Sequence, residues 1–86
     1  MIEIYSKDYC PYCDRAKQLL KNKGYDFVEY YADQDPDRLK EMLSRCNVRS
    51  FPQIFINDHH VGGFDDLYQL DQENKLDPLV KGEKND

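Results

Sequence analysis

Ile2-Glu-Ile-Tyr-Ser-Lys-Asp-Tyr-Cys-Pro-Tyr-Cys13 is the stretch that decides how this chain folds. Its first four residues alternate apolar with polar or amphipathic side chains, which predicts a strand. Pro11 suits the first turn of a helix, because the N–H that it lacks has no intrahelical partner there. Apolar residues then recur at helical spacing until Gly24, a typical C-terminal stop. The two cysteines are therefore expected where a strand passes into a helix.

A Cys-x-x-Cys pair at the start of a helix has a direct chemical meaning. The N–H groups of the first turn are unpaired, and together with the helix dipole they stabilise an anion. Cys10 should therefore have a pKa below that of an ordinary thiol, and Lys7 would add a positive charge nearby. Cys13 lies one helical turn further on, within reach of Cys10 but more buried. We predict that Cys10 attacks a disulfide and that Cys13 resolves the product.

Two other roles are open to the cysteine pair. One is half of a zinc site, completed by Cys46, His59 or His60. Structural zinc sites usually bring a second close pair of ligands, whereas adjacent histidines on a strand point to opposite faces. The other is an inert disulfide, although so short a loop constrains little of the chain. We expect a working thiol pair and no metal ion.

Length and composition limit the classes of protein to consider. The 86 residues suit one domain, expected over residues 1–80, followed by a polar tail at 81–86. A net charge of −5 argues against nucleic acid as a partner, because phosphate backbones require a basic surface. No apolar run approaches the roughly 18–20 residues that cross a bilayer, and no secretory signal precedes the first strand. Three cysteines are an odd number for a secreted disulfide scaffold, so we expect a reducing, cytoplasmic location.

The remaining segments predict a second strand, a second helix, a hairpin and a third helix. The second strand is expected at Tyr25–Tyr31. The second helix begins at Asp35 and Pro36 and carries the apolar stripe Leu39, Met42, Leu43 and Cys46. The hairpin strands are Gln53–Ile56 and His59–Val61, followed by a helix from Asp65 or Asp66 and a last helical turn at 77–80. A helical crossover makes the first two strands parallel. The order β-α-β-α-β-β-α predicts an α/β fold in which helices cover a mixed four-stranded sheet.

Three segments resemble the signatures of the glutaredoxin family, in order and at matching separations. They are Cys10-Pro-Tyr-Cys13, Ser50-Phe-Pro-Gln-Ile-Phe-Ile56 and Gly62-Gly-Phe-Asp-Asp-Leu67, against the usual CPYC, TVPxIFI and GGxDDL. The likeness runs from Ile2 to Val80 and is strongest to the short bacterial dithiol glutaredoxins. It implies a thioredoxin-like fold with Pro52 in the cis form, facing the cysteines. The residues alone would favour a trans proline before an edge strand.

The resemblance also implies a groove for glutathione as co-substrate, with no tightly bound cofactor. In the family frame, Lys7 holds a glutathione carboxylate as a point charge, and Tyr12 lines the groove. The backbone of Phe51, before Pro52, would pair with the cysteinyl unit of glutathione.

The γ-glutamyl end of glutathione would meet the start of the third helix. The resemblance implies that the N–H groups of Phe64 and Asp65 meet its carboxylate and that Asp65 pairs with its α-amino group. Taken singly, these residues have plainer roles: Lys7 as a surface lysine, Tyr12 as the cover of a helix end, and Asp65 as a cap. Within the family frame we expect Asp66 to be only a cap.

The chain departs from the family pattern in three places. Ser50–Phe51 replaces the usual Thr-Val, and the bulkier ring would reshape the groove. Phe64 stands where many relatives carry cysteine. The third cysteine is Cys46, expected to be a small core residue on the second helix. A second polar contact from that helix to glutathione has only Arg38 and Lys40 as candidates.

The resemblance implies an enzyme, a glutathione-dependent thiol–disulfide oxidoreductase that reduces protein disulfides and glutathione mixed disulfides. Its expected partners are glutathione and disulfide-containing or glutathionylated proteins, with ribonucleotide reductase a candidate, and a monomer suffices. Two alternatives stay open. Some glutaredoxins hold an iron–sulfur cluster between two chains, although Pro11 argues against this. A thioredoxin-like protein served by a flavoenzyme would be expected to carry Trp-Cys-Gly-Pro-Cys, and this chain has no tryptophan.

Overall fold

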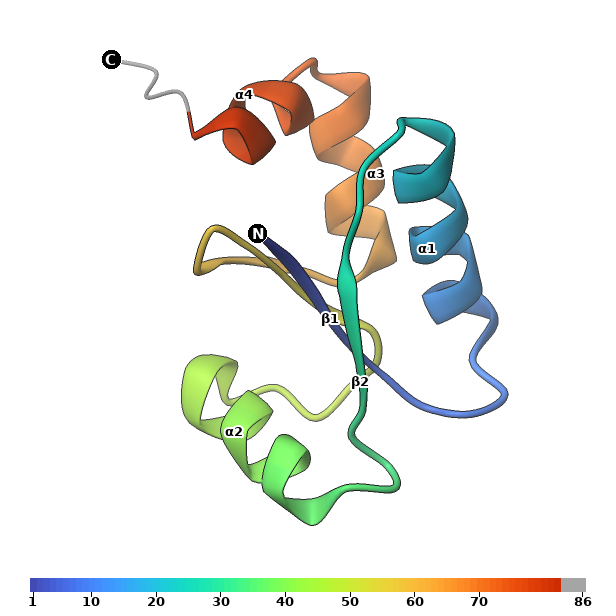
Figure 1. Cartoon of the computed structure of the whole chain (residues 1–86), viewed down its shortest axis with the longest axis vertical. Helices are drawn as coiled ribbons and strands as arrows, with labels where there is room; N and C mark the ends of the chain where they lie inside the picture. Colours follow the sequence, from blue (N-terminus) through green and yellow to red (C-terminus); the bar gives the residue numbers. More distant parts are fainter. Residues whose placement is uncertain (83–86) are drawn as a thin grey trace.

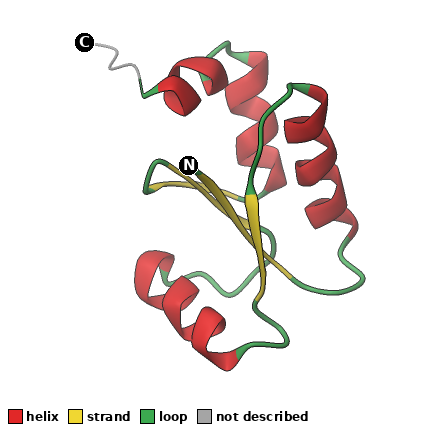
Figure 2. Cartoon of the chain, viewed as in Figure 1, coloured by secondary structure: helices red, strands yellow, loops and turns green. Residues whose placement is uncertain are grey.

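The computed structural model describes residues 1–82, which form a four-stranded sheet and its covering helices (Figure 2). The elements are β1 (Ile2–Ser6), α1 (Pro11–Asn22), β2 (Val28–Tyr31), α2 (Pro36–Cys46), β3 (Gln53–Ile56), β4 (His59–Gly62), α3 (Phe64–Gln72) and α4 (Leu76–Lys81). The expected order is confirmed, and the last helical turn is the short helix α4. The expected tail begins at the final residue of α4, and its residues 83–86 lie outside the described residues.

The sheet has the order β2-β1-β3-β4. Strands β1 and β2 are parallel, because α1 carries the chain back across the sheet between them. Strands β3 and β4 form an antiparallel hairpin, and β3 is antiparallel to β1. The mixed sheet predicted from the order of elements is confirmed, with β1 and β3 in its centre.

The two faces of the sheet are covered by different helices. Figure 1 shows α2 on one side and α1, α3 and α4 on the other. Side chains alternate along a strand, so β1 and β3 contribute to both cores. Ile2, Ile4, Ile54 and Ile56 pack with Ala16, Leu20, Leu67 and Leu76 on the side of α1, α3 and α4, whereas Tyr5 and Phe55 pack with Met42 of α2. The central strands β1 and β3 are therefore packed on both faces.

Strand β2 is shorter than the sequence predicts. It begins at Val28, and residues 25–27 connect it to α1. The backbone N–H of Tyr25 bonds Leu20 O at 2.9 Å, so this residue closes the end of α1 instead of joining the sheet. Tyr25 and Phe27 pack against the apolar core from the connection. Their aromatic character thus reflects packing and not strand pairing.

Helix α2 matches its prediction closely. The Asp35 side chain caps it by accepting the backbone N–H groups of residues 37 and 38. Met42 is fully buried, and Leu39, Leu43 and Cys46 pack around it. The core-packing role expected of Cys46 is confirmed, because it packs against the cluster that contains Met42. Its half-buried thiol also donates to Met42 O at 3.2 Å. Within residues 1–82, no helix combines the length and the apolar character that crossing a bilayer requires.

Candidate active site

Cys10 lies immediately before α1 and acts as the N-cap residue of that helix. Its sulfur accepts a hydrogen bond from the backbone N–H of Cys13 at 3.1 Å. The two sulfurs are joined in a disulfide, with the Cα atoms 5.2 Å apart. Cys13 is 1% exposed and Cys10 is 6% exposed. The predicted placement at a strand–helix junction is confirmed, and an N–H donor of the helix terminus points at the sulfur that would carry negative charge.

The loop that leads from β1 to Cys10 is anchored at its start by a buried serine. Ser6 Oγ donates to Glu29 on the neighbouring strand β2 at 2.6 Å, and Lys17 Nζ lies 2.9 Å from the same carboxylate. The hydrogen bond with Glu29 raises the pKa of Lys17. Burial raises the pKa of Glu29, but hydrogen bonds from Ser6 and Lys17 outweigh it and lower that pKa overall. The pair therefore stays charged at neutral pH and fixes the end of β1 against α1.

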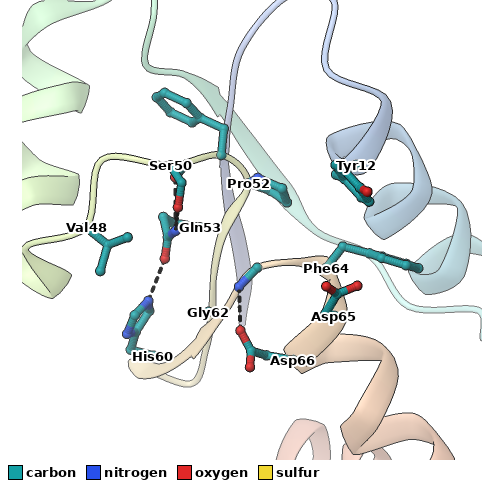
Figure 3. Close-up of a pocket in the computed structure, with 12 residues that line it drawn as sticks. Tyr12, Val48, Ser50, Pro52, Gln53, His60, Gly62, Phe64, Asp65 and Asp66 are labelled. Atoms are coloured by element: carbon teal, nitrogen blue, oxygen red, sulfur yellow. Dashed lines mark hydrogen bonds between the residues drawn. The ribbon is translucent and has the colours of Figure 1, made fainter.

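A cleft of about 340 Å³ lies beside the start of α1 (Figure 3). It is lined by Tyr12, by residues 48 and 50–53 before and within β3, and by residues 60 and 62–66 at the end of β4 and the start of α3. The Phe51–Pro52 peptide bond is cis, as the family resemblance implied. The volume lies in the usual range for a small-molecule site.

The rim of the cleft formed by α3 begins one or two residues earlier than predicted. The helix starts at Phe64, with Gly63 and not an aspartate as its N-cap residue. Asp66 accepts the backbone N–H of Gly63 at 3.1 Å, so its expected capping role is confirmed. Asp65 lies in the first turn and lines the cleft. The unpaired N–H groups of a first helical turn suit a ligand carboxylate.

An aromatic row borders the cleft on the side of α1. The rings of Tyr12 and Phe64 lie 6.3 Å apart, and those of Phe64 and Tyr68 lie 5.9 Å apart. Arg15 stacks on Tyr12 at 5.2 Å. Tyr12 is 52% exposed, which leaves its ring free to contact a ligand. Phe64 thus joins α1 and α3 through ring contacts.

The structure brings together five of the six residues that the resemblance assigned to glutathione: Tyr12, Phe51, Pro52, Phe64 and Asp65 all line the cleft. Lys7 does not line it. Its side chain is exposed, and its Nζ lies 6.0 Å from the Phe51 ring, just outside the cleft.

The two helix-two candidates do not line the cleft. Arg38 bonds Glu41 at 3.0 Å and stacks on Tyr30 at 4.1 Å, while Lys40 borders a separate surface hollow on α2. Within residues 1–82, no group of three or more His, Cys, Asp or Glu side chains gathers as a metal site would require.

Among the cleft residues that the sequence did not assign to the site are a buried amide and a histidine, Gln53 and His60. Gln53 opens an otherwise apolar strand and is 3% exposed, and His60 faces it from β4 (Figure 3). The sequence feature that could have identified Gln53 is its polar side chain in an apolar, buried strand, because such a side chain needs hydrogen-bond partners. Only the fold shows that its partners are His60 and Ser50.

Comparison with known proteins identifies the family to which the chain belongs. The glutaredoxin family model matches residues 2–61, more than half of the chain. The chain belongs to the glutaredoxin family. A glutaredoxin 3 of Escherichia coli is 50% identical over 80 residues, covering 93% of this chain and 96% of that protein. A probable glutaredoxin of Synechocystis is 54% identical over 80 residues, covering 92% and 91%.

Solved glutaredoxin structures share the architecture. The solution structure of glutaredoxin from Brucella melitensis has a TM-score of 0.81 and 48% identity, covering 98% of this chain and 92% of that one. The crystal structure of a buckwheat glutaredoxin–glutathione complex has a TM-score of 0.84 and 30% identity, covering 94% and 76%. The thioredoxin-like fold of this glutaredoxin is therefore confirmed.

Proposed function

We propose that this glutaredoxin reduces protein disulfides and glutathione mixed disulfides, with Cys10 as nucleophile and Cys13 as resolving thiol. Membership of the family makes the chain a glutathione-dependent thiol–disulfide oxidoreductase. One observation carries the assignment of roles: Cys10 Sγ sits at the N-terminus of α1 and accepts the Cys13 N–H at 3.1 Å. The same arrangement that caps the helix stabilises a thiolate at Cys10.

The reaction proceeds by thiol–disulfide exchange. The Cys10 thiolate attacks the glutathione sulfur of a mixed disulfide, and the protein sulfur leaves as a thiolate that takes a proton from solvent. A second glutathione thiolate then attacks the glutathione sulfur held on Cys10, which releases glutathione disulfide and regenerates the Cys10 thiolate. With a protein disulfide as substrate, the Cys10 thiolate attacks one sulfur and the other leaves as a thiolate. Cys13 then attacks Cys10 Sγ of this mixed disulfide and releases the second substrate sulfur as a thiol. Two glutathione molecules reduce the resulting Cys10–Cys13 disulfide and leave as glutathione disulfide.

Glutathione occupies the cleft beside Cys10. The backbone of Phe51 pairs with its cysteinyl unit, and Tyr12 and Pro52 contact it. The first-turn N–H groups at Phe64 and Asp65 receive the γ-glutamyl carboxylate. The buckwheat glutaredoxin of similar fold forms a complex with glutathione, which supports this occupant.

Two further contacts involve charged side chains. The Asp65 carboxylate pairs with the α-amino group of glutathione. Lys7 contributes its charge from outside the cleft, since its long side chain can swing from the Phe51 ring toward a carboxylate at the cleft mouth. The substrates are cytoplasmic glutathionylated or disulfide-containing proteins, with ribonucleotide reductase a candidate, and the enzyme works as a monomer.

Three cysteine variants test the mechanism. Cys10→Ser should abolish all turnover in an assay that couples reduction of a small glutathione mixed disulfide to glutathione reductase. Cys13→Ser should retain this activity but lose the reduction of a protein disulfide. Cys46→Ser, which changes a cysteine outside the cleft, is the matched control and should keep both activities. Full activity of the Cys10→Ser protein would exclude the mechanism.

A further inference from the structure

Gln53 is a buried amide whose polar atoms all have partners (Figure 3). Its Nε2 donates to the carbonyl oxygen of Ser50 at 2.9 Å and to Ser50 Oγ at 3.1 Å. Its Oε1 lies 2.7 Å from Nε2 of His60. Three residues from the loop, β3 and β4 thus form one continuous chain of hydrogen bonds along the floor of the cleft.

The orientation of this chain is fixed by the Ser50 carbonyl. A carbonyl oxygen only accepts hydrogen bonds, so the Gln53 amide must turn its NH2 group toward Ser50. The reversed amide would place two oxygens against each other at 2.9 Å. Oε1 therefore faces His60 and can only accept. It follows that the His60 ring carries a proton on Nε2.

His60 is held in place independently of this hydrogen bond. It pairs with Phe55 across the hairpin, and the two rings lie 5.0 Å apart. The register of β3 and β4 shifts by one residue next to this pair, between Ile54 and Phe55. Such a bulge changes the direction in which neighbouring side chains point. The ring therefore meets Gln53 from a fixed position on the sheet.

We propose that His60 is a positioning residue for glutathione, acting through Gln53 on Ser50. The carbonyl of Ser50 and the N–H of Phe51 belong to one planar peptide unit. When Gln53 holds that carbonyl, it also sets the direction of the Phe51 N–H, the backbone group that faces the cysteinyl unit of glutathione in the proposed complex. The inference rests on the proposed occupancy of the cleft by glutathione.

A pair of substitutions at His60 separates the hydrogen bond from the ring. His60→Phe keeps a ring against Phe55 but has no donor, so Gln53 Oε1 loses its partner. We expect the KM for a small glutathione mixed disulfide to rise about fivefold with kcat within about twofold, because ground-state binding is lost. His60→Gln places an N–H donor at a similar reach and should restore the KM to within about twofold of the wild type.

His59→Phe is the matched control, since His59 is the exposed neighbour on the same strand. It should leave both constants unchanged. If the His60→Phe and His60→Gln proteins have the same KM, or if kcat falls while KM holds, the positioning role is wrong. Absence of glutathione-dependent turnover in the wild type would instead refute the proposed function itself.

A spectroscopic measurement on the wild type tests the relay even where His60→Phe fails to fold. Long-range proton–nitrogen correlation spectra of the neutral His60 ring should show the proton on Nε2, the nitrogen that faces Gln53 Oε1. The Gln53 amide protons should exchange slowly with solvent. A neutral ring protonated on Nδ1 would overturn the proposal whatever the kinetics show.

Discussion

Replacing Gly62 by alanine should lower the free energy of unfolding of this glutaredoxin and also weaken the binding of glutathione substrates in its cleft. Gly62 ends β4 with φ +115°, a backbone conformation that L-residues with a side chain rarely adopt. A Cβ at this position would lie 2.3 Å from Oδ2 and 2.9 Å from Cγ of Asp66. The substitution therefore strains the backbone and displaces the carboxylate that caps α3.

The size of the effect follows from these two contributions. A residue forced into a sparsely populated backbone region costs about 1–3 kcal/mol. The displaced Asp66 carboxylate loses its 3.1 Å hydrogen bond from Gly63, and loss of a helix cap costs about 1 kcal/mol. We expect Gly62→Ala to lower the free energy of unfolding by about 2–4 kcal/mol, and to lower the Tm by more than about 8 °C for a domain of this size.

Two further variants separate the contributions in urea denaturation followed by circular dichroism. Gly24→Ala also has a positive φ, +80°, but its Cβ would meet nothing within 4 Å. It should cost only about 1 kcal/mol and leave the KM for glutathione substrates unchanged. Asp66→Ala removes the carboxylate, so adding Gly62→Ala to it should cost about 1 kcal/mol less than in the wild type.

If Gly62→Ala costs no more than Gly24→Ala, the contact with Asp66 does not matter. Strict additivity of Gly62→Ala and Asp66→Ala would lead to the same conclusion. A rise in KM for Gly62→Ala, with Gly24→Ala unchanged, would connect the cap of α3 to ligand binding.

Two further predictions concern a buried tyrosine and an acidic residue of the cleft. Tyr5→Phe removes a buried hydroxyl that donates to Glu41 at 2.7 Å and accepts from Arg45 at 3.0 Å, so urea denaturation at pH 7 should show a loss of about 1–2 kcal/mol. Burial and the hydrogen bond to Glu41 raise the pKa of Tyr5 from 10.0 to about 12. The contribution of this hydroxyl to the free energy of unfolding is therefore fully present below pH 10 and is lost as the pH rises toward about 12. The free energy of unfolding of Tyr5→Phe should accordingly fall less steeply with pH in this alkaline range than that of the wild type. Asp65→Asn should raise the KM for a glutathione mixed disulfide up to about fivefold with kcat unchanged, because one exposed ion pair contributes at most about 1 kcal/mol. The exposed Asp26→Asn, outside the cleft, should have no effect on either constant, and an equal KM in the two variants would contradict the role of Asp65.

Features encoded within one or two helical turns were predicted well from the sequence. The start of α1 at Cys10–Pro11 and the cap of α2 at Asp35 depend on neighbouring residues only. The stripe through Met42 likewise follows from helical spacing, and the structure buries it as expected. The family signatures then pointed to five residues that line the cleft.

Features that depend on distant partners were predicted less well. Tyr25 and Phe27 are residue types that favour strands. In the structure, however, the Tyr25 N–H bonds the end of α1 and both side chains pack against the apolar core, so neither residue joins the sheet. The start of α3 was also missed, although its cap is local: Asp66 accepts the N–H of Gly63, three residues before it, so the helix begins at Phe64. In the segment before β2, a local preference was overridden by contacts that local patterns do not specify.

The sequence by itself determined the nucleophile and its electrostatic environment, because the Cys-Pro-Tyr-Cys segment carries its own helix terminus. Only the tertiary structure decided what stands beside that nucleophile. It set Lys7 outside the cleft and joined His60, Gln53 and Ser50 into one hydrogen-bonded chain. The physical reason is that a helix cap is made by adjacent residues, whereas the walls of a cleft are made by segments that meet only after the sheet has formed.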